Sequence, residues 1–206
     1  MAPDLDGLLQ RFTAWGAGPT VDGYVELFAP DGTLFDSGMD QPLGRDHIRP
    51  LITATLQLLD GFRFVPIRHG RNEDTLYVEA QNSATLGGTA LAWPAVYCLT
   101  AAGDRVARGR RYYDQAPLFP AVGDTPTEDL TGCGPLSIEV VTSGSGEGVW
   151  FREWVGTAAP TGEPQRFAAM ERHSSGATTW FYNSLALLPR AAAQFAAFQR
   201  VLIQPT

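Results

Sequence analysis

Apolar residues near the start of the chain recur at three- and four-residue steps, which is the period of an α-helix. Over residues 6–28 they do so on either side of a Gly-Ala-Gly-Pro break, so the sequence predicts two short helices there. A turn at Pro30-Asp31-Gly32 then leads into a short strand over Thr33–Asp36. A third helix is predicted over Arg45–Leu59, where the apolar residues form one stripe.

Beyond Gly61 the pattern changes to an alternation of apolar and polar residues, as in half-buried strands. Four strands are predicted, over Phe62–His69, Thr75–Thr85, Ala90–Thr100 and Arg105–Asp114. Helices followed by a run of antiparallel hairpins are typical of an α+β domain, with the helices on one face of a curved sheet. We assign this first domain to residues 1–119, with space for a cavity between helices and sheet.

A segment over residues 120–135, rich in Pro, Gly and acidic side chains, predicts a linker. Alternation then resumes over residues 136–206, with a closing helix after Pro189 that extends to about Leu202. The four strands expected there are Leu136–Thr142, Gly148–Thr157, Gln165–His173 and Thr178–Leu187. They follow the order and approximate lengths of the first four, so we interpret this half as a partial repeat of the sheet. Since it lacks the three helices, its sheet should pack against the first domain.

Composition excludes several classes of function. A net charge of −7 argues against a surface that follows nucleic-acid phosphates. No apolar run reaches the length of a membrane span, and the two cysteines and three histidines lack the spacing of a metal site. No phosphate-binding or dinucleotide-binding loop occurs either. We therefore expect a cytoplasmic protein without metal or organic cofactor.

Three motifs resemble one known superfamily: residues 25–36 (VELFAPDGTLFD), residues 44–49 (GRDHIR) and the terminal Arg111-Tyr112-Tyr113-Asp114. They are similar to motifs of the nuclear transport factor 2-like superfamily, which contains SnoaL-like polyketide cyclases, ketosteroid isomerase and limonene epoxide hydrolase. The likeness extends over about residues 5–119. It implies a cone-shaped domain whose hollow interior binds an apolar small molecule, and either a homodimer or a monomer with pseudo-dimeric sheets.

The resemblance places Asp36 where ketosteroid isomerase has its general base. A carboxylate in an apolar cone can have its pKa raised and then transfer a proton between two carbons. The alternative is that Asp36 only caps the turn before Gly38. Other positions depart from the isomerase, since Phe12 stands where its oxyanion-binding Tyr would be and Val96 where its partner Asp would be. The epoxide hydrolase relay is also missing, because Ala80, Asn82 and Arg111 occupy its positions.

Alternation and the resemblance together give the expected lining of the cone. On the last strand Arg111 and Tyr113 share one side with Gly109, and the family comparison puts that side inside. The predicted substrate-binding residues are Phe12, Leu76, Val78, Asn82, Val96, Cys98 and Tyr113, with Asp36 and Arg111 as the catalytic pair. We expect Arg111 to pair with Asp36 and to lower the pKa of its carboxyl. The alternative for this pair is a purely structural ion pair.

The sequence thus predicts an isomerase or lyase of secondary metabolism, such as antibiotic biosynthesis. It would be a cofactor-independent cyclase or isomerase that acts on a polyketide or terpenoid intermediate, with Asp36 as general acid/base. The alternative is a non-catalytic small-molecule-binding or accessory protein on the same scaffold, because the oxyanion donors of the isomerase are missing.

Overall fold

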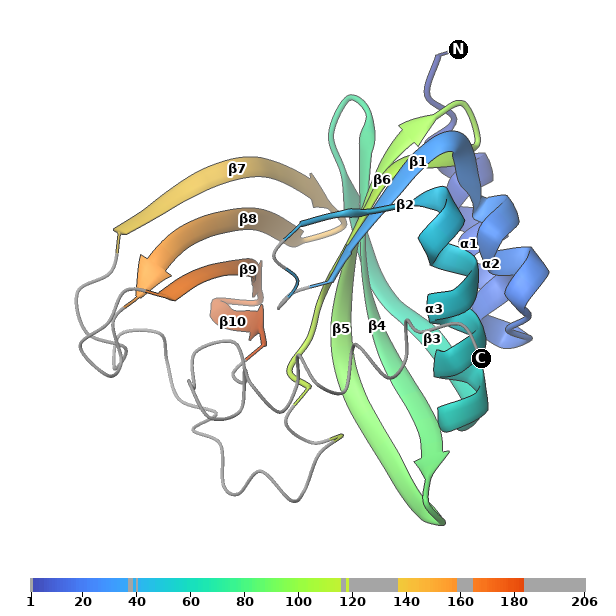
Figure 1. The fold of residues 1–206 in the computed structure, drawn as a ribbon. Helices are drawn as coiled ribbons and strands as arrows, with labels where there is room; N and C mark the ends of the chain where they lie inside the picture. Colours follow the sequence, from blue (N-terminus) through green and yellow to red (C-terminus); the bar gives the residue numbers. More distant parts are fainter. Residues whose placement is uncertain are drawn as a thin grey trace.

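The computed structural model describes residues 2–36, 39, 41–115, 118, 137–158 and 165–183 of the chain. Helices α1 (Leu5–Ala17), α2 (Val21–Leu27) and α3 (Arg45–Leu58) lie on one side of a strongly curved sheet, and a second group of strands lies on the other side (Figure 1). The α+β class and the three predicted helices are confirmed.

The first two helices begin where short polar side chains cap them. The Asp4 carboxylate accepts a 2.9 Å hydrogen bond from the Gly7 amide at the start of α1. The Thr20 hydroxyl accepts a 3.1 Å bond from the Gly23 amide at the start of α2. Such caps satisfy amides that have no partner within the helix. The Gly-Ala-Gly-Pro break therefore separates two helices, each with its own start signal.

The strands of the described residues form one continuous hydrogen-bonded order, β10-β9-β8-β7-β3-β4-β5-β6-β1-β2. In the first half these are β1 (Phe28–Asp36), β2 (Leu43–Gly44), β3 (Asp60–Arg71), β4 (Thr75–Leu86), β5 (Thr89–Ala102) and β6 (Arg105–Tyr112). In the second half they are β7 (Ser137–Gly146), β8 (Val149–Ala158), β9 (Gln165–Ser174) and β10 (Ala177–Tyr182). The expected run of antiparallel hairpins is present over β3–β6, whereas β1 runs parallel to β6.

The main core lies between the helices and the concave face of β3–β6. Phe12 of α1 packs against Phe64 of β3 and Tyr97 of β5, with ring centroids 4.6 and 4.9 Å away. Phe64 and Tyr97 are themselves 5.3 Å apart. These three rings and the aliphatic residues around them are buried in one cluster. The concave face is therefore packed with large apolar side chains.

The convex face of β4–β6 is covered by the second sheet, as the sequence predicted for the repeat. Tyr77 of β4 stacks on Phe151 of β8 with ring centroids 5.7 Å apart and an interplanar angle of 5°. Val96, Cys98 and Tyr112 of the first sheet complete one buried cluster with residues of β8–β10. Among the described residues, backbone pairing between the halves amounts to the single pair Arg71–Ser145 in the β3–β7 ladder. Side-chain packing therefore holds the two sheets together.

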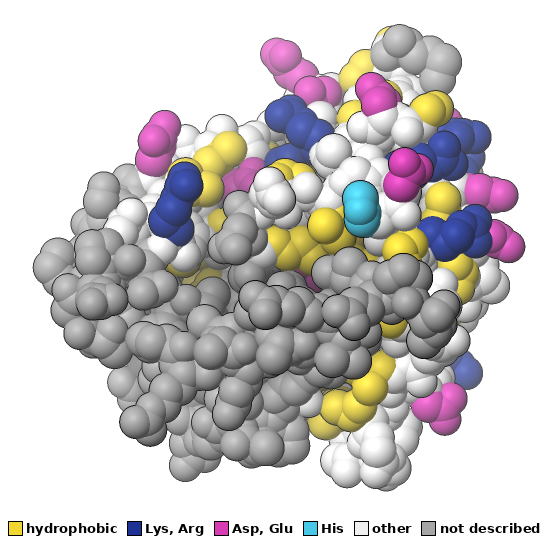
Figure 2. Space-filling model, in the orientation of Figure 1, with side chains coloured by type: hydrophobic (Ala, Val, Ile, Leu, Met, Phe, Trp, Pro, Cys, Tyr) yellow, Lys and Arg dark blue, Asp and Glu magenta, His cyan; other side chains and the backbone are white. Residues whose placement is uncertain are grey.

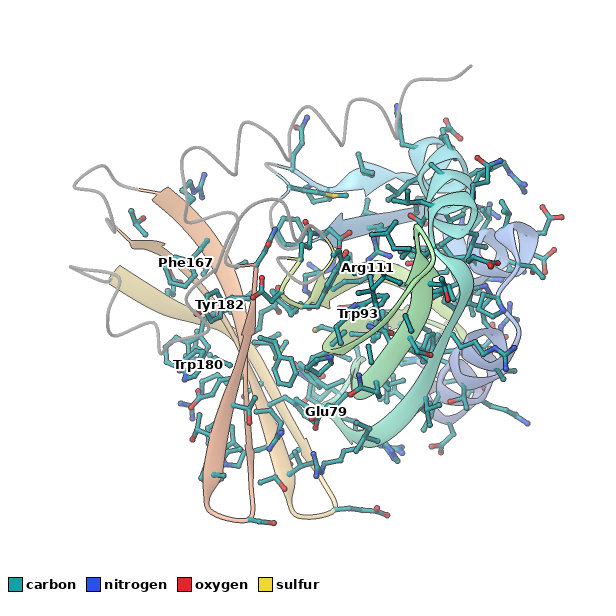
Figure 3. The ribbon with its side chains drawn as sticks, turned by 90° about the horizontal axis from the view of Figure 1, so that it is seen from below. Glu79, Trp93, Arg111, Phe167, Trp180 and Tyr182 are labelled. Atoms are coloured by element: carbon teal, nitrogen blue, oxygen red, sulfur yellow. The ribbon has the colours of Figure 1, made fainter. Side chains whose placement is uncertain are left out.

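Two buried carboxylates, one on each sheet, form ion pairs with arginines of the opposite sheet. Glu79 of β4 accepts a 3.1 Å hydrogen bond from Arg172 of β9, and it also pairs with Arg68 at 2.9 Å. Figure 3 shows Glu79 between the two sheets. Glu153 of β8 accepts from Arg110 of β6 at 2.6 Å and from the hydroxyl of Tyr112. Each sheet thus carries a buried acidic side chain that pairs with an Arg of the other sheet.

Some expectations lie outside the described residues. The linker over 120–135 and the closing helix over 189–202 are among them, as are the last residues of the strand expected over Thr178–Leu187. Each of the four strands expected after the linker overlaps one of β7–β10. The origin of these strands by duplication, the domain limits and the oligomeric state stay predictions.

Because the two sheets share one core, Phe151→Ala should destabilise the whole first domain. Phe151 is fully buried, and removing such a ring costs about 3–5 kcal/mol of unfolding free energy. Urea unfolding followed by tryptophan fluorescence and by far-ultraviolet circular dichroism would give this value. The control Val65→Ala, at a side chain 66% exposed, should change stability by less than about 0.5 kcal/mol. Separate unfolding of the two halves would contradict the shared core.

Candidate functional site

Asp36 and Arg111 meet at the ends of two neighbouring strands. β1 and β6 run parallel, and their register places Asp36 beside Arg111. Arg111 donates from Nε to Asp36 Oδ1 at 2.9 Å and from Nη2 to Oδ2. This two-pronged geometry matches the planar guanidinium fork to the carboxylate. The ion pair expected from the sequence is present, and the side chain of Arg111 is 13% exposed and that of Asp36 6% exposed.

The pKa of Asp36 follows from its burial more than from its partner. Burial raises the pKa of the carboxyl, while the charge and hydrogen bonds of Arg111 and the hydroxyl of Tyr113 oppose the rise. The expectation that Arg111 lowers the pKa of Asp36 is wrong in its net direction, because desolvation of the carboxylate is the larger effect. For Arg111, burial alone would lower the pKa, but the charge of Asp36 raises it well above its ordinary value.

A chain of polar side chains continues from Asp36 toward the second sheet. The Tyr113 hydroxyl lies 3.5 Å from Asp36 Oδ2 and accepts a 3.2 Å hydrogen bond from Gln115 Nε2. Gln115 Oε1 in turn accepts a 3.2 Å bond from Asn183, the residue after β10. Gln115 and Asn183 are both buried. The second half of the chain therefore contacts the candidate site through hydrogen bonds, a link that the sequence did not predict.

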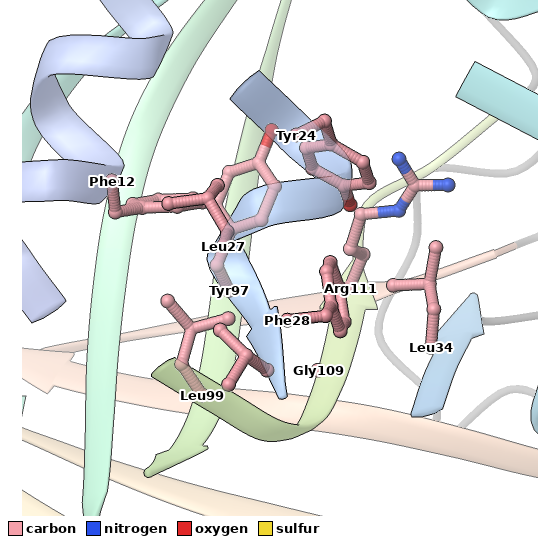
Figure 4. A pocket seen from close by; sticks show the side chains of 10 residues that line it. Phe12, Tyr24, Leu27, Phe28, Leu34, Tyr97, Leu99, Gly109 and Arg111 are labelled. Carbon is pink, nitrogen blue, oxygen red and sulfur yellow. The ribbon is translucent and has the colours of Figure 1, made fainter. Parts of the chain in front are cut away.

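The cone interior next to Arg111 is almost filled. A space of about 10 Å³ remains there, bordered by side chains of α1, α2, β1, β5 and β6 (Figure 4). Such a volume holds about one water molecule. Tyr24 and Arg111 lie close together at this space (Figure 4), and burial raises the pKa of the Tyr24 phenol. The space beside Arg111 is thus of the size of one water molecule.

The predicted lining residues divide between the two faces of the sheet. Phe12, Leu76 and Val78 belong to the core on the concave side. Asn82 is buried, and its Oδ1 accepts a 2.8 Å hydrogen bond from the Tyr97 hydroxyl.

The prediction for Val96 and Cys98 is wrong, because both belong to the cluster on the convex side. The cause is the antiparallel register of β4 and β5, which pairs Leu76 with Leu99 and Val78 with Tyr97. Directly paired residues share a face, so the odd-numbered residues of β5 face the cone. Tyr97 and Leu99 of β5 are lining residues that the sequence analysis missed, and the register of the hairpin would have revealed them.

The described residues contain no group of three or more His, Cys, Asp or Glu side chains that could bind a metal ion. Within the same residues, no helix has the length and apolar character needed to cross a membrane. On the face shown in Figure 2, acidic and basic side chains of the described residues are interspersed and form no basic patch.

Comparison with known proteins identifies the first domain. The SnoaL-like domain family matches residues 9–109. No curated protein matches the chain. A hypothetical protein of ketosteroid isomerase-like fold from Catenulispora acidiphila, solved with trimethylamine, is 21% identical and has a TM-score of 0.51. The match covers 58% of this chain and 92% of that protein.

Two further solved structures are similar over the same part of the chain. A candidate SnoaL-like polyketide cyclase from Jannaschia sp. CCS1 is 18% identical, with a TM-score of 0.50 over 59% of this chain and 92% of its own. AclR of Streptomyces galilaeus, described as a candidate hydroxylase, is 16% identical, with a TM-score of 0.50 over 59% and 87%. At these identities the likeness establishes the fold.

A double-mutant cycle should give strong coupling between Asp36 and Arg111. Either Asp36→Asn or Arg111→Met leaves a buried charge without its partner, which costs about 3–5 kcal/mol of unfolding free energy. The double variant should cost less than the sum of the two. The exposed pair Asp22–Arg49, changed in the same way, is the control and should give coupling below about 1 kcal/mol. Additive effects at Asp36 and Arg111, measured by urea unfolding, would rule out the proposed coupling.

Proposed function

We propose that this chain, whose first domain belongs to the nuclear transport factor 2-like superfamily, is a cofactor-independent isomerase or cyclase. Its substrate would be an apolar biosynthetic intermediate of polyketide or terpenoid type. The observation that carries the proposal is the buried carboxyl of Asp36, whose pKa is raised and which has Arg111 as a charged partner. Buried carboxyls with raised pKa values are suited to general acid and base catalysis near neutral pH.

In this mechanism Asp36 removes a proton from a carbon next to a substrate carbonyl, and the electron pair moves to the oxygen to form an enolate. Isomerisation follows when Asp36 returns the proton to another carbon of the enolate. In cyclisation the enolate carbon attacks a second carbonyl of the same molecule and forms a C–C bond, and the resulting alkoxide takes the proton back from Asp36. Both routes need a positive or hydrogen-bonding group at the enolate oxygen.

Arg111 is the best placed group for the enolate oxygen. It borders the gap of about 10 Å³, which has room for one oxygen atom. Asn82, which the sequence analysis placed among the substrate-binding residues, is hydrogen-bonded to Tyr97. Tyr113 would orient Asp36 rather than bind substrate, because its hydroxyl lies 3.5 Å from Asp36 Oδ2.

A second candidate function is a binding or accessory protein without turnover. It is favoured by Phe12 and Val96, which stand where the isomerase has its oxyanion-binding groups. The small size of the space beside Arg111, about 10 Å³, is also consistent with it. The two functions differ in whether a bound molecule is converted.

Asp36→Asn tests the catalytic proposal. The assay uses poly-β-ketones that can cyclise and β,γ-unsaturated ketones in deuterated water, with products and deuterium uptake followed by mass spectrometry and NMR. Loss of the general base should lower turnover at least about 100-fold, with much less effect on binding. The control Asp31→Asn changes an exposed residue of the same strand and should leave turnover unchanged. Equal turnover in Asp36→Asn, or binding without conversion by the wild type, would favour the accessory function.

The pH dependence of turnover should follow Asp36. A general base works when deprotonated, so activity should rise with pH through the pKa of this carboxyl. Because the pKa is raised above 3.8 in the folded protein, the midpoint of the acidic limb should lie above that value. The measurement is kcat/KM between pH 3.5 and 8 on protein shown to be folded by circular dichroism. An acidic limb centred at or below 3.8 would assign the base to another group.

A further inference from the structure

A second cleft lies outside the cone, between the two sheets. It has a volume of about 530 Å³ and is bordered by the convex face of β1 and β6 and by the facing side of β7–β9. Small-molecule sites in proteins have volumes of about 300–1,000 Å³. This cleft is therefore large enough for a small molecule, whereas the gap beside Arg111 is not. Neither Asp36 nor Arg111 lines it.

The floor of the cleft carries charged and hydroxyl groups that retain binding capacity. Arg110 donates to Glu153 from Nε, to Cys98 Sγ from Nη2 at 2.8 Å and weakly to Thr100 from Nη1 at 3.4 Å. A guanidinium has five N–H donors, so two of those on Arg110 have no acceptor among the described residues. The Glu153 carboxylate already accepts hydrogen bonds from Arg110 and Tyr112. The floor of the cleft can therefore offer hydrogen-bond donors to a ligand.

The walls of the cleft are apolar and partly open to solvent. Val141 of β7 is 53% exposed and Val155 of β8 is 39% exposed. The half-buried ring of Phe35 lines the cleft from β1. Apolar side chains that line a concave site and remain exposed favour the binding of an apolar group, because that removes their surface from water.

Charge at the edge of the cleft distinguishes between possible ligands. Arg108 lines the cleft, is exposed and takes part in none of the ion pairs of the described residues. Asp74 is the acidic residue of the lining besides Glu153, and its Oδ1 already accepts a 2.7 Å hydrogen bond from Thr75. An acidic group on a ligand would therefore find its partner at Arg108, with the donors of Arg110 behind it.

We infer that the cleft between the sheets is a binding site for a small amphipathic molecule, with an apolar body and one anionic oxygen group. The apolar body lies between Phe35 and the two valines, and the anionic group lies at Arg108. The inference does not depend on catalysis by Asp36, because no residue of the proposed acid–base pair lines this cleft.

Two fluorescent probes with the same apolar body test the inference. 8-Anilinonaphthalene-1-sulfonate has the anionic group, and N-phenyl-1-naphthylamine lacks it. The wild type should bind both saturably at one site, with the sulfonate tighter. Arg108→Gln should weaken the sulfonate about tenfold and leave the neutral probe within about twofold, since it removes one charge-assisted contact. Val155→Asp should weaken both probes at least about tenfold.

Matched controls separate this site from other surfaces. Arg63→Gln and Val65→Asp make the same changes at exposed positions of β3 and should leave both affinities unchanged. Asp36→Asn should also leave them unchanged, since it lies outside the cleft. Circular dichroism verifies that each variant is folded. The inference is overturned if the wild type binds no sulfonate probe at one site, if the control variants weaken binding as much as the cleft variants, or if only Asp36→Asn abolishes it.

Discussion

The burial of carboxylates against arginines of the opposite sheet is the constraint on which the structure depends. A buried carboxylate without a partner would cost several kcal/mol, so Glu153 requires Arg110, while Glu79 is shared between Arg68 of its own sheet and Arg172 of the opposite sheet. These pairs permit one arrangement of the sheets, whereas the apolar contacts around Tyr77 and Phe151 would tolerate small shifts. Since the described part of the chain has a single backbone pair between the halves, side chains contribute most to their relative position there.

Strand β6 connects these ion pairs to Asp36, because it carries both Arg110 and Arg111. Successive residues of a strand point to opposite faces, so Arg110 and Tyr112 face the second sheet while Arg111 and Tyr113 face the cone side. On one face an Arg and a Tyr hold Glu153, and on the other face an Arg and a Tyr contact Asp36. This explains the motif Arg110-Arg111-Tyr112-Tyr113, which serves two acidic side chains at once. A displacement of the second sheet would move β6 and change the geometry at Asp36.

Sequence patterns predicted the elements better than the details of the site. Period and turn residues were sufficient for the helices and for strands on both sides of the linker, because these signals are local. The pairing of Asp36 with Arg111 followed from the family resemblance. The faces of Val96 and Cys98 were wrong because a face on β5 depends on the register with β4, which alternation within one strand does not define. The packing of Phe12 against Phe64 and Tyr97 depends on the tertiary structure, and the contact from Asn183 to Gln115 spans 68 residues.

The distribution of open space bears on how such a chain recognises a small molecule. In the cone, room next to Arg111 amounts to about 10 Å³, while the cleft between the sheets has about 530 Å³. The family match ends at residue 109, before β7–β10, and five of the fifteen described residues that line the cleft come from β7–β9. A sheet attached through a few buried ion pairs leaves space where its edge diverges from the first sheet. Because β6 forms one wall of the cleft and also carries Arg111, a molecule bound between the sheets would contact the strand that positions the Asp36 carboxylate.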